Sequence, residues 1–296
     1  MDYTKTKIND RGSGLHFRAS VINSKKNMYY YISKPSFFLS QYVKQYWSLE
    51  SCIATGREHI QRIVPNGLFE LIIYLDDKPI TIDQQKSVSD NIVITGQLNS
   101  YHELKVMGKL SLFAIYFLPH GLSMFLDLPM KEIFNMSVPL KFIIKDTVDK
   151  LEDELSSAET FKKKIEIAES FLLAQIKKNE KKYKFERIRH AVNLINQSKG
   201  IIEIEDLASD IFLSRKQFER TFSDFIGTSP KQFLKIVRFQ NAIYEKSKNS
   251  ELNLTEIAHK CGYFDQPHMI NDFKTLSGIT PKNYFENNDY FSDYFG

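Results

Sequence analysis

An internal repeat of about 50 residues in the last third of the chain restricts the fold more than any other feature of the sequence. Apolar and small residues recur in the same order, and the second copy has one extra residue in its turn. The matched pairs are Leu207-Ala208 with Ile257-Ala258, Phe218 with Met269, Phe222 with Phe273, Gly227 with Gly278, Pro230 with Pro281, and Phe233 with Tyr284. A repeat of this kind predicts two copies of one supersecondary unit.

Each copy has the pattern of a helix-turn-helix. Ala208 on the first helix allows the second helix to cross it closely, and Phe218 and Phe222, four residues apart, face the shared core. Ser214 and Gln217 form a predicted capping box at the start of the second helix. The other predicted helix signals are Asp265 as the N-cap in the second copy, Gly227 and Gly278 as helix ends, and Ser229-Pro230 and Thr280-Pro281 as new helix starts.

The second helix of such a unit enters the major groove of DNA, so its exposed residues are candidates for reading bases. These recognition helices are predicted at about 214–226 and 265–277. The candidate DNA-binding residues are Arg215, Lys216, Glu219 and Arg220 in the first helix, and Gln266, Ile270, Asn271 and Lys274 in the second. The alternative is an ordinary solvated helix face. His268 is predicted to cap or pack at the start of its helix instead of reading a base.

The chemistry of these side chains suggests that the first helix is the stronger reader. Arg220 matches guanine and Glu219 accepts from cytosine, whereas Asn271 matches adenine and Ile270 contacts a thymine methyl group. Lys274 is the one positive charge predicted on the second face. Residues 184–286 carry 15 Lys and Arg against 13 Asp and Glu, so any DNA contact depends on placement and not on bulk charge.

Together these residues resemble the AraC/XylS family of bacterial regulators. The strongest matches are Ala208, Phe218-Glu219-Arg220-Thr221-Phe222, Gly227-Thr228-Ser229-Pro230, Ile257-Ala258, Gly262-Tyr263, Asp265-Gln266, Phe273-Lys274 and Gly278-Ile279-Thr280-Pro281. The resemblance implies two helix-turn-helix units joined by a long helix from Pro230 to about Ser247, and an activator that binds specific DNA sequences. The chain departs from the family pattern at Met269 and Asn271, where Phe and Arg are frequent, and at Phe212, which we interpret as local packing.

The first half of the chain has the pattern of a small β barrel or sandwich. Apolar runs at 69–75, 91–96 and 112–118 are separated by turn clusters such as Pro65-Asn66-Gly67. The region resembles the cupin-like sensing domains of such regulators at Tyr46-Trp47, Val64-Pro65-Asn66-Gly67, Glu70-Leu71, Gly96-Gln97 and Phe117-Leu118-Pro119-His120-Gly121. That resemblance implies ligand sensing or dimerisation, and it identifies no effector.

From Ile144 onward the apolar spacing becomes helical. Two alternatives fit this segment: a seam between two subunits, or a helical hairpin packed on the β-rich domain, which we favour. The expected fold is therefore α+β with two domains: a β-rich cupin-like domain (1–140), a helical segment and linker ending in the charged run 177–182 (141–184), two helix-turn-helix units (185–287) and a tail (288–296).

Charge and cysteine content exclude several classes of protein. The net charge of +4 is too small to indicate a nucleic-acid partner by itself, and Cys52 and Cys261 lie too far apart in the sequence to suggest a disulfide framework or a zinc site. No run of about 18 apolar residues and no signal-peptide pattern is present, so neither a membrane partner nor export is expected. The predicted location is the cytoplasm.

A metal-dependent cupin enzyme is the main alternative from another class. Its metal would need clustered ligands, but His59, His102 and His120 are scattered and only His102-Glu103 sits close. No catalytic residue, metal or cofactor is predicted. The other alternative is a DNA-binding regulator whose first domain binds a protein such as RNA polymerase and senses no ligand. Double-stranded DNA is the expected partner, with a small-molecule effector, RNA polymerase and a second copy as open alternatives.

Glu70 is the one polar residue that we considered for an effector pocket, because its strand is otherwise apolar. The alternative, which we favour, is an ion pair between Glu70 and Arg62 near a strand end.

Overall fold

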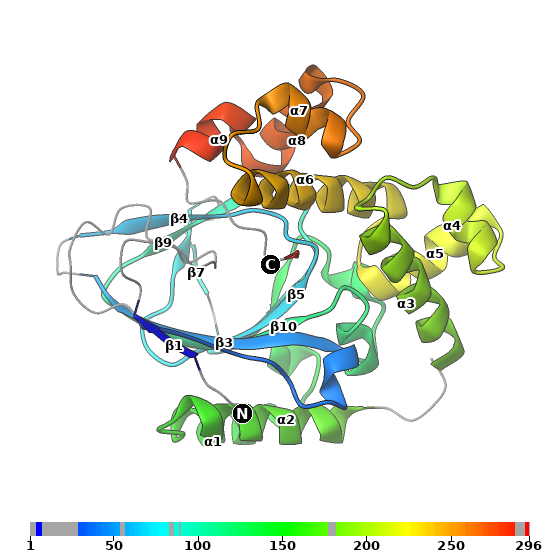
Figure 1. Ribbon diagram of the computed structural model, residues 1–296. Coiled ribbons are helices and arrows are strands. Elements are labelled where there is room, and N and C mark those ends of the chain that lie inside the picture. Colours follow the sequence, from blue (N-terminus) through cyan, green and yellow to red (C-terminus); the bar gives the residue numbers. More distant parts are fainter. Residues whose placement is uncertain are drawn as a thin grey trace.

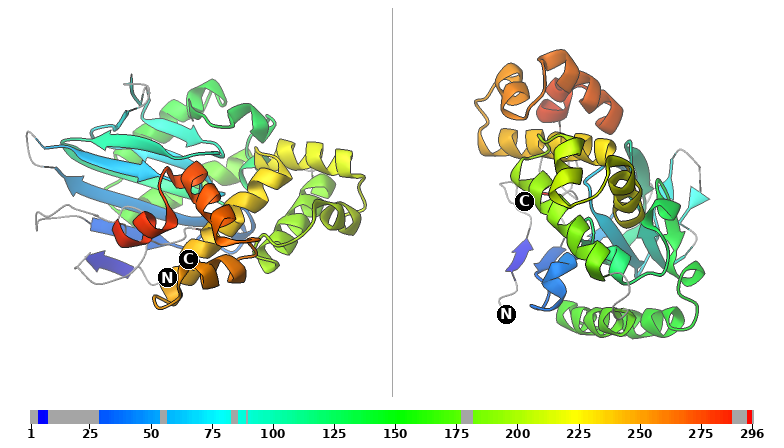
Figure 2. Two further views of the ribbon diagram at one scale, coloured as in Figure 1. Left: turned by 90° about the horizontal axis from the view of Figure 1, so that it is seen from above. Right: turned by 90° about the vertical axis from the view of Figure 1, so that its right-hand side faces the viewer.

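The computed structural model describes residues 4–7, 29–53, 57–82, 86–88, 90–176, 182–287 and 294–295. The described strands come first in the chain and the α-helices follow them, which confirms the α+β division (Figure 1). The α1–α2 hairpin (Val148–Ser156 and Phe161–Gln175) lies on one side of the sheets and helices α6 to α9 lie on the other (Figure 2). Most of the charged run at the expected domain boundary falls outside the described residues.

The β-rich domain contains two antiparallel sheets. The seven-stranded sheet has the order β1-β2-β3-β10-β5-β8-β11 and the four-stranded sheet has the order β4-β9-β6-β7. Their bounds are β1 Thr4–Lys7, β2 Tyr29–Ser33, β3 Val43–Cys52, β4 His59–Ile63, β5 Phe69–Tyr74, β6 Ile80–Thr81, β7 Lys86–Ser87, β8 Ile92–Thr95, β9 His102–Val106, β10 Lys109–Phe117 and β11 Ser137–Pro139. Residues of β10 after Lys109 are buried on both faces, which explains its apolar run from Leu112 to Phe117.

The α1–α2 hairpin packs on the large sheet. Phe161 lies edge-on to Phe113 of β10, with ring centroids 6.0 Å apart. Glu169 of α2 accepts hydrogen bonds from the Tyr46 hydroxyl at 3.2 Å and from the Ser36 backbone amide at 2.8 Å. These contacts support the packed hairpin over the intersubunit seam.

The second part of the chain consists of α-helices in the order that the repeat predicts. They are α3 Lys182–Gln197, α4 Ile204–Asp210, α5 Arg215–Ile226, α6 Pro230–Lys248, α7 Leu254–Lys260, α8 Gln266–Ser277 and α9 Pro281–Asn287. We call α4 with α5 unit one, and α7 with α8 unit two; α6 is the long helix between them (Figure 1). None of the helices in the described part of the chain is long and apolar enough to span a bilayer.

The predicted helix signals are confirmed. Ser214 and Gln217 form a complete capping box at the start of α5, and Asp265 accepts the His268 backbone amide at 2.7 Å at the start of α8. Gly227 and Gly278 end the two recognition helices in the left-handed conformation, with φ of 84° and 76°. Local sequence therefore determined where these helices begin and end.

Two buried clusters run through the molecule, and they do not coincide with the two predicted domains. The larger cluster joins the β-rich domain to unit one, from Phe113 through Phe185 to Phe222. The smaller cluster is formed by unit two and α6, and it includes Val64 from the β-rich domain. The first helix-turn-helix unit therefore shares its core with the sheets.

The sequence assigned residues 294–295 to a tail, but they are packed between the β-rich domain and helices α3 and α6. Tyr294 is buried against Phe233 of α6, and its hydroxyl donates to Asn196 Oδ1 at 2.5 Å. Lys44 Nζ of β3 donates to the Tyr294 carbonyl oxygen at 2.7 Å. The end of the chain thus ties α3 and α6 to the large sheet.

Two sequence interpretations were wrong. Phe212 does not pack locally: its side chain is 86% exposed, and its backbone has φ of 56°. Arg62 pairs with Glu103 at 2.6 Å instead of Glu70, because β4 pairs with β9 in a register that sets these two residues opposite each other. The sequence could not reveal that register, which depends on which strands become neighbours.

Candidate nucleic-acid interface

Helix α5 separates an aromatic core face from a polar outer face. Phe218 and Phe222 are fully buried, with ring centroids 5.3 Å apart, and Phe222 packs edge-on against Phe233 of α6. The predicted DNA-binding residues lie on the other side: Arg215, Lys216 and Arg220 are exposed and Glu219 is half-buried. The structure therefore brings all four onto the outward face of one helix.

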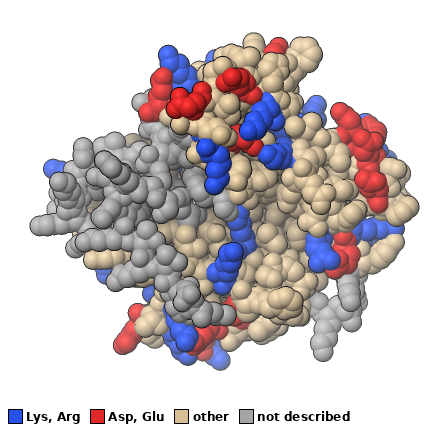
Figure 3. All heavy atoms as spheres, in the orientation of Figure 1, with Lys and Arg blue, Asp and Glu red and all other residues tan. Residues whose placement is uncertain are grey.

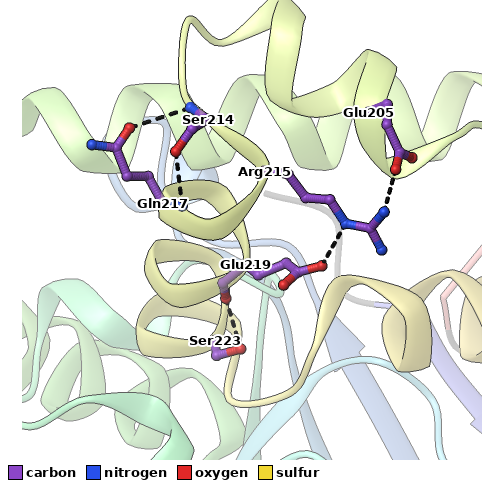
Figure 4. A network of polar contacts seen from close by, with 6 residues as sticks. All are labelled: Glu205, Ser214, Arg215, Gln217, Glu219 and Ser223. Carbon is purple, nitrogen blue, oxygen red and sulfur yellow. Dashed lines mark hydrogen bonds and ion pairs between the residues drawn. The ribbon is translucent and has the colours of Figure 1, made fainter.

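Arg215 is held by two carboxylates (Figure 4). Its Nε donates to Glu219 Oε1 at 3.0 Å, and its guanidinium also pairs with Glu205 of α4. The hydrogen bond to Glu219 and the charges of both carboxylates hold the pKa of Arg215 above its ordinary value. Among the described residues, Lys216 and Arg220 have no such ion pair, so they are the more available cations of this face.

Helix α8 presents a less charged face. Met269 and Phe273 are fully buried, and among the predicted readers Asn271 and Lys274 are exposed while Gln266 and Ile270 are half-buried. The Thr255 hydroxyl of α7 donates to Gln266 Oε1 at 2.9 Å, which orients that amide at the start of the helix. The four predicted residues of the second helix also share one side.

His268 and Asp272 support α8 from positions between the readers. The His268 ring lies edge-on to Tyr263, 5.3 Å between centroids, as predicted for a residue that packs at the helix start. Asp272 is buried and pairs with Lys235 of α6 at 3.0 Å. This ion pair anchors α8 to α6, directly beside exposed Asn271.

The charge around these helices is mixed. Acidic side chains gather over α4, next to α5, and basic and acidic groups alternate over α6 to α8 (Figure 3). The exposed acidic residues of the α4 region are Glu203, Glu205, Asp206 and Asp210. This pattern fits the small charge excess of the sequence: among the described residues on the face shown in Figure 3, the cations are individually placed and form no broad basic patch.

The β-rich domain contacts the C-terminal end of each recognition helix. At α5, a Cβ atom added to Gly227 would lie 3.1 Å from the Met130 carbonyl oxygen, and Lys131 pairs with Asp224 at 2.9 Å. At α8, a Cβ atom added to Gly278 would lie 2.4 Å from the Tyr101 ring. The helix ends that carry Arg215 and Gln266 are the opposite ends.

Two further contacts attach unit two and α6 to the β-rich domain. Arg62 of β4 donates to the Ser277 carbonyl oxygen at 3.2 Å, and its guanidinium lies 4.7 Å from the centroid of the Tyr101 ring. Gln240 of α6 is fully buried and donates to the Pro65 carbonyl oxygen at 2.8 Å. Sequence reasoning missed these residues, because nothing in the local sequence indicates which distant helix a strand-end residue will meet.

The metal-enzyme alternative gains no support from the positions of its candidate ligands. His102 and Glu103 are neighbours on β9, where Glu103 is engaged by Arg62. His120 is buried elsewhere, and burial lowers its pKa to about 4. In the described ranges, no group of three or more His, Cys, Asp or Glu side chains is arranged to hold a metal ion.

Comparison with known proteins agrees with the geometry of α4 to α9. Residues 207–287 match a family described as "Helix-turn-helix domain". The C-terminal third of the chain is an AraC-type helix-turn-helix domain. The strands preceding it match a different family, described as "Domain of unknown function (DUF6597)", over residues 32–139.

Relatives of the AraC-type domain are named as transcription regulators. An uncharacterised HTH-type transcriptional regulator of Haemophilus influenzae is 33% identical over 93 residues, 31% of each chain. The lactose operon transcription activator of Staphylococcus xylosus is 32% identical over 100 residues, 33% of this chain and 36% of the relative. The match thus spans about a third of the length of these relatives.

Solved structures show weaker likenesses. ToxT of Vibrio cholerae, as its apo K231A variant, is 13% identical with a TM-score of 0.42, over 81% of this chain and 97% of its own. The DNA-binding domain of AdpA in complex with a target DNA is 24% identical with a TM-score of 0.31, over 33% of this chain and 88% of its own. These scores are too low to place individual side chains of the AraC-type domain.

Proposed function

We propose that this protein is a transcription regulator that binds specific DNA sequences by inserting α5 and α8 into successive major grooves. The observation that carries the proposal is that both recognition helices expose their polar side, and that the β-rich domain contacts their C-terminal ends, opposite to the ends that carry Arg215 and Gln266. The N-terminal part of a recognition helix is the part that meets base edges.

The two helices divide the reading between them. We assign Arg220 to guanine and Lys216 to a phosphate or guanine, because both are exposed cations outside the Arg215 network. Arg215 and Glu219 would contact DNA after giving up their mutual hydrogen bond, which weakens both as readers. In unit two, Asn271 and Gln266 suit adenine, Ile270 a thymine methyl group and Lys274 a phosphate.

The length of α6 suits this arrangement. Its 19 residues span about 28 Å along the helix axis, and successive major grooves on one face of DNA are about 34 Å apart. Where the spacing of the two recognition helices differs from the spacing of the grooves, the DNA would bend or unit two would contact only the DNA backbone.

The remaining roles follow from the AraC-type domain and its relatives. We propose activation, as the name of the Staphylococcus xylosus relative states for that protein. We assign the protein no enzymatic activity and, because its partner is chromosomal DNA, a place in the cytoplasm. The β-rich domain would then control the DNA-binding domain that it contacts, through a small-molecule effector, a second copy of the chain or RNA polymerase.

Selection of binding sites from a random pool of DNA duplexes tests the proposal. The full chain is used, because unit one shares its core with the sheets. The salt concentration is fixed, because non-specific DNA binding depends strongly on it. We expect enrichment of two short motifs about one helical turn apart. Failure of the full chain to enrich any sequence at low and moderate salt would contradict the proposal.

A further inference from the structure

Glu245, near the end of α6, links unit two to the loop that precedes unit one. Its carboxylate accepts from Lys199 Nζ at 2.6 Å and from Lys260 Nζ at 2.7 Å. Lys199 lies just before unit one and Lys260 ends the first helix of unit two. The Glu245 side chain is only 6% exposed, whereas each lysine is about half-exposed. One buried carboxylate therefore forms ion pairs with two lysines, one before unit one and one in unit two.

The ion pairs dominate the environment of this carboxylate. Burial alone would raise the pKa of Glu245, but the hydrogen bonds and charges of Lys199 and Lys260 hold it below its ordinary value. Removing the negative charge would leave two ammonium groups close together without the carboxylate that neutralises both of them.

Arg238 makes a second link of the same kind, seven residues earlier on α6. Its Nη1 donates to the Gly200 carbonyl oxygen, before unit one, at 3.2 Å. Its guanidinium also lies 5.9 Å from the centroid of the Tyr263 ring, in the turn of unit two. Residues seven apart share a face of a helix, so Arg238 and Glu245 form one line of contacts along α6.

The residues that precede unit one also touch unit two directly along this line. A Cβ atom added to Gly262, in the turn of unit two, would lie 2.5 Å from the side chain of Ile201. Gly262 has φ of 71°, and the residue at its place in unit one is the exposed Phe212. We call the set Lys199, Gly200, Ile201, Arg238, Glu245, Lys260, Gly262 and Tyr263 the inter-unit junction.

We propose that the inter-unit junction fixes the position of α8 relative to α5, and that Glu245 is the positioning residue that makes the protein select one spacing between its two DNA half-sites. This inference rests on the proposed function. Each unit already packs on α6, and the β-rich domain contacts the C-terminal end of each recognition helix. The inter-unit junction adds a direct contact between unit two and the residues that precede unit one, and this contact limits rocking of unit two about α6. Glu245 and Arg238 face the junction, so they act on DNA only through the helices they hold.

The test measures spacing discrimination with the full-length protein. Equilibrium binding is determined for the selected duplex and for duplexes with one base pair added or removed between the two motifs. For Glu245→Gln we expect affinity for the selected spacing within about twofold of wild type, and discrimination against the other two spacings reduced by about fivefold or more. Glu286→Gln, which removes an exposed glutamate paired with Lys282 outside the junction, is the control and should bind as wild type does.

Lys260→Met provides a second variant if Glu245→Gln fails to fold, because it removes one half-exposed cation and leaves Glu245 paired with Lys199. It should also widen the accepted spacing. Unchanged discrimination in a folded variant would overturn the inference, and so would an equal loss of affinity at all three spacings, which indicates a merely structural role. Absence of sequence-specific binding by the wild-type protein would instead overturn the proposed function, and the inference with it.

Discussion

Arg220 and Arg215 lie one and a half turns apart on the same helix, yet their surroundings differ. Arg215 is engaged by Glu205 and Glu219, whereas Arg220 has no ion pair within the described part of the chain. A side chain that must first leave a carboxylate contributes less to binding than one that is already available. The ion pairs of Arg215 therefore make Arg220 the more available of the two arginines.

Arg220→Ala should weaken specific DNA binding by about 1 to 3 kcal/mol without affecting the fold. Asn271→Ala should cost less, because α8 has the less charged face. Titration of the selected duplex with each variant, with circular dichroism as the control for folding, measures both effects. A larger loss for Asn271→Ala would reverse the order of the two readers.

Phe212→Gly should stabilise the protein, because Phe212 has a positive φ of 56° and its ring is exposed. The left-handed conformation costs a non-glycine residue roughly 1 to 2 kcal/mol, and the extra freedom of Gly in the unfolded chain offsets part of this gain. We expect a net rise of up to about 1 kcal/mol in the free energy of unfolding, measured with urea.

Phe264→Gly is the matched control for that change. Phe264 is 88% exposed and is absent from the described residues with positive φ, so its replacement removes a similar ring without relieving backbone strain. It should lower stability or leave it unchanged. Equal gains for both variants would show that the exposed ring, and not the backbone conformation, is responsible.

At the scale of elements, the capping box of α5 links stability to DNA binding. Ser214 and Gln217 each bond to the backbone amide of the other, which fixes the first turn, where Arg215 and Lys216 begin the reading face (Figure 4). In the proposed complex the same turn meets the DNA first. An ordered first turn therefore contributes both to the stability of the fold and to the proposed DNA binding.

Ser214→Ala should lower the free energy of unfolding by about 1 kcal/mol and also weaken DNA binding. Ser229→Ala removes the corresponding cap of α6, whose side chain accepts from the Gln232 amide at 3.2 Å, away from the reading face. That variant should lose comparable stability and little affinity. A similar loss of affinity in both would mean that global stability, and not the first turn of α5, sets the binding.

At the scale of the whole molecule, the shared core makes the β-rich domain and unit one cooperative. Trp47, the single tryptophan in the sequence, lies in the β-rich domain and is buried in the cluster that extends to Phe222 of unit one. Urea unfolding followed by tryptophan fluorescence should therefore coincide with unfolding followed by helical circular dichroism. Two separated transitions would show that the contact between the β-rich domain and unit one is weak.

His120 makes the joint between the sheets and α3 sensitive to acid. Its ring lies edge-on to Phe185 of α3, and its Nε2 is 3.3 Å from the Gln41 carbonyl oxygen. Burial lowers the pKa of His120 to about 4, and the Arg189 charge acts in the same direction. The folded protein thus binds this proton more weakly than the unfolded chain does.

Because that pKa is depressed, stability from neutral His120 is complete above about pH 6.5 and is lost as the pH falls toward 4. The slope should reach about 1.4 kcal/mol per pH unit. Urea unfolding at a series of pH values measures it, and His120→Leu should show a smaller slope in this window. Parallel curves for the two proteins would assign the acid sensitivity to other groups.

The sequence by itself determined the features that depend on near neighbours. The caps at Ser214 and Asp265, the glycines at 227 and 278 and the outward side of each recognition helix follow from residues within one or two turns. The repeat follows from comparing the two copies along the sequence. Only the tertiary structure decided what meets across the molecule: Arg62 with Glu103, Tyr101 with Gly278, Gln240 with Pro65, and Glu245 with Lys199 and Lys260. Those pairs depend on strand register and on the docking of distant elements, because a side chain's partner is set by the path of the whole chain and not by the residues beside it.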